Sequence, residues 1–236
     1  MSDARRTPLD LLERLMTNEA ELAPGVALIE AYTMAGLLKL LWYGDRAATD
    51  VVVLLGGAMG GFSGPAGSLY LELGEYYAAA GKGVICCDYR RPDKLDLSLL
   101  DGAATADWAM REGARRFVVV GHSFGGAVAV QLGTALTGHC VGVATLATQS
   151  AGCEGAAQLG PTPLVLFHGD RDIILGPENS AMVQALAGGG DLRIIPGADH
   201  AFAEGRDALR DQLVEWIDER FAAQADQDAQ GGHEPR

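Results

Sequence analysis

Short apolar runs alternate along the chain with longer amphipathic segments. The runs typical of strands are VALIEAYT (26–33), LLKLLWYG (37–44), DVVVLLGG (50–57), GVICCDYR (83–90), RFVVVGHS (116–123), GVATLATQ (142–149), PLVLFHGD (163–170) and LRIIPGAD (192–199). Apolar residues three and four positions apart predict helices over 67–81, 97–114, 124–136, 178–189 and 206–223. The chain therefore alternates strand and helix from the third run onward.

This alternation predicts an α/β fold of the doubly wound kind. Helices between consecutive strands require right-handed crossovers, and these produce a mostly parallel sheet that is covered by helices on both faces. The first two runs are too close together for a crossover, so we expect them to form an antiparallel start. The prediction is a sheet of about eight strands.

The two ends of the chain differ from the rest. The segment LDLLERLM (9–16) has helical spacing and predicts a leading helix within residues 1–20. The segment QADQDAQGGHEPR (224–236) is almost free of apolar side chains, so burial would not offset the entropy of ordering, and we expect a disordered tail. With 236 residues and 48% hydrophobic content, the remainder predicts one domain over residues 1–223.

Charge and cysteine content restrict the classes of partner and ligand that the protein is expected to bind. The formal net charge of -13 disfavours nucleic acid and anionic membranes as partners, because the field of the protein repels them. No segment has the apolar length of a membrane span or the pattern of a signal peptide, so we expect a cytoplasmic monomer or homodimer. The four cysteines lack the spacing of a zinc site and are expected to be reduced thiols, and no metal is expected.

A serine stands where the strand run 116–123 meets the helix pattern 124–136. Gly121, Ser123 and Gly125 fit G-x-S-x-G, in which small residues permit a sharp turn that lifts the serine hydroxyl clear of the sheet. A glycine-rich connection with an incidental serine is the plainer alternative. The strand before the motif and the helix after it favour a nucleophile, because both are part of that turn's geometry.

A serine nucleophile needs a base, and the chain contains five histidines. His122 adjoins the nucleophile, His139 ends a predicted helix, His168 ends a strand with an expected structural role in the turn, and His233 lies in the predicted tail. His200 directly follows the last predicted strand, at the sheet edge where Ser123 also lies. His200 is therefore the predicted base.

The group that orients this base is expected in LFHGDRDIIL, which offers Asp170 and Asp172 after the preceding strand. The chain order Ser, Asp, His matches the order in α/β-hydrolases. Together, GHSFG (121–125), HGDRD (168–172) and GADH (197–200) resemble the α/β-hydrolase superfamily, from about the first strand to the last helix. This resemblance implies Asp172, the final residue of H-G-x-x-D, as the acid, and leaves Asp199 as a loop residue.

The same resemblance implies two backbone donors for an oxyanion. One is the N–H of Phe124, and the other follows the strand run 50–57, where Gly56 and Gly57 replace the His-Gly common in relatives. Ala58 is the first candidate for the second donor and Met59 is the next. A phosphate-binding loop is the competing interpretation, but Phe62 stands where its lysine is required and no G-x-G-x-x-G is present, so no cofactor is expected.

The bond that the serine attacks is the least determined feature. Between the runs 142–149 and 163–170 the chain is too short for the helical cap that many relatives insert, which suggests a small lidless carboxylesterase. The chain also resembles dienelactone-hydrolase-like enzymes, although these usually carry Cys at the nucleophile position, where this chain has Ser123. Phe62, Leu69, Tyr70 and Phe202 are the candidate substrate contacts. Thioester, amide or carbon–carbon cleavage, acyl transfer and non-catalytic ligand binding remain alternatives to ester hydrolysis.

Overall fold

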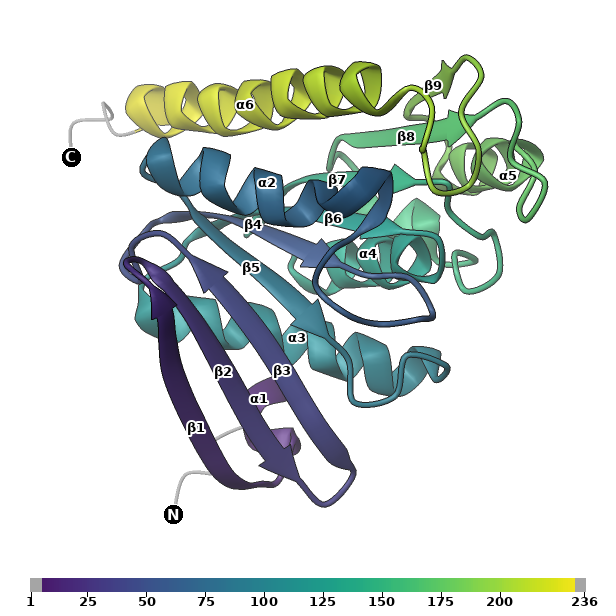
Figure 1. Ribbon diagram of the computed structural model, residues 1–236. Coiled ribbons are helices and arrows are strands. Elements are labelled where there is room, and N and C mark those ends of the chain that lie inside the picture. The colour runs from purple at the N-terminus through teal and green to yellow at the C-terminus, as the bar shows by residue number, and fades with distance from the viewer. Residues whose placement is uncertain (1–5, 232–236) are drawn as a thin grey trace.

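The computed structural model describes residues 6–231, and within them one nine-stranded sheet has the order β1-β2-β3-β5-β4-β6-β7-β8-β9 (Figure 1). The strands are β1 (Arg14–Ala23), β2 (Val26–Thr33), β3 (Gly36–Tyr43), β4 (Asp50–Leu55), β5 (Gly83–Asp88), β6 (Arg116–His122), β7 (Cys140–Leu146), β8 (Leu164–Gly169) and β9 (Asp191–Ile195). The helices are α1 (Pro8–Leu11), α2 (Pro65–Ala79), α3 (Leu95–Glu112), α4 (Phe124–Ala135), α5 (Glu178–Ala187) and α6 (Arg206–Gly231), with a 3₁₀ turn η1 (Ala156–Leu159).

The sheet is antiparallel at one side and parallel elsewhere. β1, β2, β3 and β5 pair antiparallel in that order, and β5, β4, β6, β7, β8 and β9 pair parallel. The predicted doubly wound α/β class and the antiparallel start are confirmed. The parallel strands place their carboxyl ends at one edge, where the loops after β4, β6, β8 and β9 gather.

Helices cover both faces of the sheet (Figure 1). On the central strand β4, Val51, Val53 and Leu55 belong to the apolar cluster that includes side chains of α3, α4 and α5. Val52 and Leu54 belong to the other cluster, with side chains of α2 and α6. Since both faces of this strand are buried, its sequence is continuously apolar rather than alternating.

The prediction of a leading helix within residues 1–20 is wrong over most of residues 6–20, the part of this range that the structure describes. Only the short helix α1 forms, and the chain then continues as the edge strand β1; residues 1–5 lie outside the described residues. The helical spacing has no surface to pack on beyond α1, since Leu15 and Met16 are exposed. The backbone instead pairs with β2, and β1 is the ninth strand that the predicted count omitted.

The predicted tail over 224–236 is also wrong over its described part, because α6 continues to Gly231. A helix that is already nucleated extends at little cost through alanine and glutamine, which are good helix formers. Apolar content alone therefore underestimated helix length here. The remaining residues of that prediction, 232–236, lie outside the described residues.

The connection between β7 and β8 contains no helical cap domain. The described residues 147–163 form only the turn η1 and irregular loop, in agreement with the predicted absence of a lid. In the part of the chain that the structure describes, no helix combines the length and the apolar content needed to cross a bilayer.

Candidate active site

Ser123 occupies a tight turn between β6 and α4. Its φ of 55° and ψ of -119° lie outside the regions that side chains favour, so the surrounding packing must hold it there. A Cβ at Gly121 would collide with the carbonyl oxygen of Gly125, and a Cβ at Gly125 would collide with that of Gly56. The two glycines of the motif are thus required by close backbone approach.

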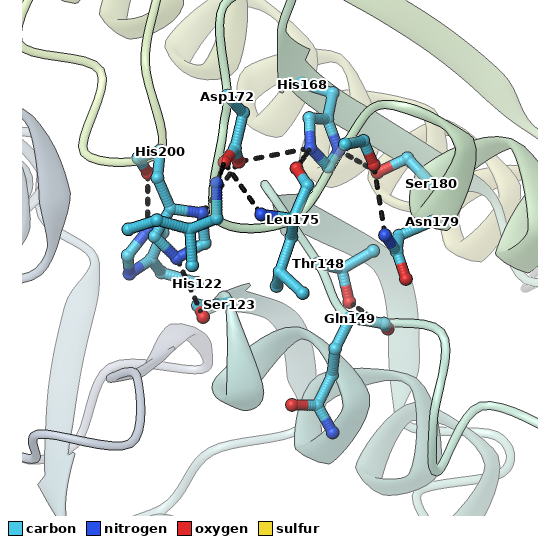
Figure 2. Close-up of polar contacts among 12 residues, drawn as sticks. His122, Ser123, Thr148, Gln149, His168, Asp172, Leu175, Asn179, Ser180 and His200 are labelled. Carbon is cyan, nitrogen blue, oxygen red and sulfur yellow. Dashed lines mark hydrogen bonds and ion pairs between the residues drawn. The ribbon is translucent and has the colours of Figure 1, made fainter.

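The loops after β8 and β9 bring Asp172 and His200 to this serine (Figure 2). His200 Nδ1 lies 2.7 Å from Asp172 Oδ2, and His200 Nε2 lies 3.0 Å from Ser123 Oγ. Because a carboxylate only accepts hydrogen bonds, Nδ1 of the neutral ring carries the proton and Nε2 is left as the acceptor. The structure therefore joins the three predicted residues into a chain that can draw a proton from Ser123.

Asp172 is buried and held as a carboxylate. Burial raises the pKa of Asp172, but the N–H of Leu175, the hydrogen bond to His200 and the N–H of Ile174 outweigh it, and the pKa lies below its ordinary value. Both N–H groups donate to Oδ1, at 2.9 Å from Leu175 and 2.8 Å from Ile174. The Asp172 carboxylate is therefore ionised and oriented with Oδ2 toward His200, where its negative charge would stabilise an imidazolium.

His122 links the turn to the loop of the base. Its Nε2 donates to the carbonyl oxygen of His200 at 2.9 Å, and the two rings lie 5.0 Å apart (Figure 2). Burial lowers the pKa of His122 to about 4, in spite of the hydrogen bond to His200, which raises it. His122 is therefore neutral at neutral pH and contacts the backbone of His200.

This lowered pKa predicts a loss of stability in weak acid. Between about pH 6.5, where histidine ordinarily titrates, and pH 4, the unfolded chain binds a proton that the folded chain does not. The free energy of unfolding then falls as pH falls, by up to about 3 kcal/mol from this group. The variant His122→Gln keeps a hydrogen-bond donor but cannot titrate. We expect its free energy of unfolding to fall correspondingly less as pH falls, as measured by urea unfolding at pH 7.0, 5.5 and 4.5. Equal decreases in the free energy of unfolding of the two proteins would contradict a lowered pKa of His122.

The loop after β4 lies beside Ser123. A Cβ built on Gly57 would be 3.6 Å from Cβ of Ser123, which is an ordinary contact distance, so the loop passes directly beside this serine. Ala58 and Met59 follow in a turn closed by the N–H of Gly60 on the carbonyl oxygen of Gly57, 3.0 Å away, and the Met59 side chain points into solvent. The N–H of Phe124, in the first turn of α4, has no intrahelical acceptor.

Three hydrogen bonds hold this loop and the start of α2 in place. The N–H of Gly61 donates to Oδ1 of Asp88 at 2.7 Å. At the start of α2, where three successive residues have left-handed backbone, the N–H of Ala66 donates to the carbonyl oxygen of Ala201 at 2.7 Å. Arg206 Nε donates to the carbonyl oxygen of Ala66 at 2.8 Å. The loop after β4 is thereby joined to the loop that carries His200, and the sequence offered no local signal for these contacts.

Three of the four predicted substrate contacts are core residues. Leu69, Tyr70 and Phe202 are buried, and the Tyr70 hydroxyl donates to the carbonyl oxygen of Leu55 at 3.0 Å. Their side chains complete the cluster between the sheet and α2 and α6, so no surface is left for a ligand. Phe62 is half-buried against the same cluster.

Exposed apolar side chains border the site elsewhere. Ile173 and Ile174, directly after Asp172, are 96% and 69% exposed, and Met59 is 96% exposed. Gly, Pro, Asn, Asp and Ser dominate turns, so two consecutive isoleucines directly after Asp172 are a signal in the sequence that could have pointed to these side chains.

The other candidate residues lie apart from the reacting atoms. Asp170 accepts the N–H of Gly197 at 2.6 Å, and Asp199 accepts that of Ala203 at 2.9 Å, so both organise loop backbone. His139 contacts the carbonyl oxygen of Arg115. The four cysteines, all within the described residues, form no disulfide, and the described residues contain no cluster of three or more His, Cys, Asp or Glu arranged to hold a metal.

No protein-family model and no curated protein sequence matches this chain. Solved structures do resemble it. Est1E from Butyrivibrio proteoclasticus superposes with a TM-score of 0.66 at 15% identity, over 83% of this chain and 99% of that one. A putative α/β-hydrolase from Agrobacterium tumefaciens gives 0.66 at 20% identity, over 83% and 97%. The 2-hydroxy-6-oxo-6-phenylhexa-2,4-dienoate hydrolase from Rhodococcus gives 0.62 at 17% identity, over 84% and 99%. The chain has the α/β-hydrolase fold.

Proposed function

We propose that this protein is a serine hydrolase that cleaves small carboxylic esters through an acyl-enzyme intermediate. The observation that carries the proposal is the continuous hydrogen-bonded chain from Ser123 through His200 to Asp172. The position of the serine in a strained turn at the carboxyl edge of the sheet supports it, because the hydroxyl is then available to a substrate from outside.

The reaction follows from the hydrogen-bond directions. His200 Nε2 takes the proton as Ser123 Oγ attacks the ester carbonyl carbon, and Asp172 stabilises the imidazolium. The N–H of Phe124 and an N–H at Ala58 or Met59 would stabilise the oxyanion. His200 then protonates the leaving alcohol oxygen. In the second half, His200 removes a proton from water, which attacks the acyl carbon, and returns the proton to Ser123 as the acid leaves.

A fluorophosphonate probe followed by a substrate panel tests this function. We expect the probe to label Ser123, identified by mass spectrometry of the digested protein, and Ser123→Ala to remain unlabelled. The panel compares matched p-nitrophenyl esters, thioesters and anilides, with esters expected to be fastest. A labelled serine with faster thioester or amide cleavage would move the proposal to that bond, and an unlabelled serine without turnover would indicate a ligand-binding protein.

The lack of a cap predicts a preference for short acyl chains. Exposed apolar side chains next to Asp172 include Ile173 and Ile174, and each acyl methylene that is buried against such a surface contributes about 0.8 kcal/mol only until that surface is covered. We expect kcat/KM for p-nitrophenyl acetate to butyrate to exceed that for the decanoate. Rates should rise smoothly through the solubility limit of the substrate. A rate jump at that limit together with a long-chain preference would show that another segment acts as a lid.

A further inference from the structure

A second histidine lies against the carboxylate of Asp172, on the side away from the base. His168, at the end of β8, is completely buried, and its Nε2 lies 3.3 Å from Asp172 Oδ2 (Figure 2). The same Nε2 lies 2.7 Å from the carbonyl oxygen of Leu175. Its Nδ1 lies 2.6 Å from the hydroxyl of Ser180, which is also buried. The proposed reaction leaves this side chain without a role.

The partners of His168 indicate which ring nitrogen carries the hydrogen in the neutral ring. Nε2 faces two oxygens that only accept hydrogen bonds, so it carries a proton and donates. Nδ1 of the neutral ring then accepts from the Ser180 hydroxyl, which can rotate to donate. Ser180 is held in the first turn of α5, so the ring is fixed from a helix as well as from the sheet.

Four groups therefore surround the Asp172 carboxylate. Oδ1 accepts the N–H groups of Ile174 and Leu175, and Oδ2 accepts from His200 and faces the donor of His168. The N–H groups anchor one oxygen only. The N–H at His168 Nε2 is hydrogen-bonded to the Leu175 carbonyl, which belongs to the turn that supplies those N–H groups, and the same ring lies against the other oxygen, Oδ2, at 3.3 Å.

We propose that His168 is a positioning residue that orients the Asp172 carboxylate toward His200, with Ser180 fixing the His168 ring. This inference rests on the proposed function for its kinetic consequence, whereas the orientation itself is a property of the resting protein. The loss of His168's donor then affects turnover more than substrate binding, because the ester does not contact it.

A matched pair of substitutions separates positioning from bulk. His168→Gln keeps an N–H donor near the place of Nε2, whereas His168→Met has similar volume and no donor. We expect kcat for p-nitrophenyl butyrate to fall by on the order of 10-fold to 100-fold in His168→Met, with KM within about twofold, since small misplacements of a reacting group carry losses of that size. His168→Gln should remain within about threefold of the unchanged protein. Equal kcat values in the two variants would overturn the proposal.

A spectroscopic measurement tests the orientation without any turnover. The proton shared by His200 Nδ1 and Asp172 should give a far-downfield proton NMR resonance, assigned by its loss in His200→Ala. We expect it to persist in His168→Gln and to move upfield or broaden in His168→Met. An unchanged resonance in His168→Met would overturn the proposal, even if no ester is turned over. Ser180→Ala, which leaves every Asp172 contact in place, provides a milder variant in case His168→Met does not fold, with the same direction and a severalfold loss expected.

Discussion

Ser123→Ala and His200→Ala are each expected to lower ester turnover by on the order of 10³ or more, and the double variant by a similar factor. The two side chains act as one unit, since the base at 3.0 Å has no function without the hydroxyl and the hydroxyl is a weak nucleophile without the base. The measurement is kcat for p-nitrophenyl butyrate with the four proteins at pH 7.5.

Folding has to be controlled for in this comparison. Urea unfolding should give similar midpoints for the four proteins, because Ser123 and His200 are only partly buried and neither fills the apolar core. Additive losses in the double variant would show that the two residues act independently. Near-full turnover by Ser123→Ala would remove the proposed function altogether.

The second large effect is expected at Asp172. Asp172→Asn should lower kcat by on the order of 10³ to 10⁴, because an amide carries no charge for the imidazolium and can present an N–H toward His200, which favours the wrong tautomer. The carboxylate lies 2.7 Å from Nδ1 of His200, and its lowered pKa keeps it ionised at neutral pH, so the charge is present where it is needed.

Asp170→Asn is the matched control for this effect. Asp170 lies two positions earlier, is exposed, and contacts the N–H of Gly197 through an oxygen that asparagine retains. We expect this variant to keep kcat within a few-fold of the unchanged protein. The reverse ranking of the two variants would transfer the orienting role to Asp170.

Local patterns predicted those parts of the molecule that depend on neighbours in sequence. The apolar runs from 26–33 to 192–199 are strands in the structure, and each predicted helix after residue 60 is present. The turn at Ser123 could be predicted from the G-x-S-x-G spacing, although only Gly121 is required by a clash within that stretch, whereas Gly125 is required by its approach to Gly56. The structure also joins Ser123, His200 and Asp172, whose positions after the parallel strands β6, β9 and β8 placed them at one edge of the sheet.

Contacts between distant segments were not predictable in the same way. Leu69, Tyr70 and Phe202 were expected at the substrate and lie in the core, because apolar residues beside a site and apolar residues beneath it have the same pattern. The segment after α1 has helical spacing but forms strand β1, because its apolar side chains have no surface to pack against and its backbone pairs with β2.

By itself, the sequence determined the α/β class, the nucleophile turn and the short list of groups able to act with it. These follow from periodicity and from the G-x-S-x-G spacing, which are short-range properties. The tertiary structure alone decided that Asp172 is enclosed by four groups, that Ala66 joins the loop after β4 to Ala201, and that His168 faces the Asp172 carboxylate. These contacts depend on strand order and on loops meeting at one edge, and no spacing along the chain encodes them.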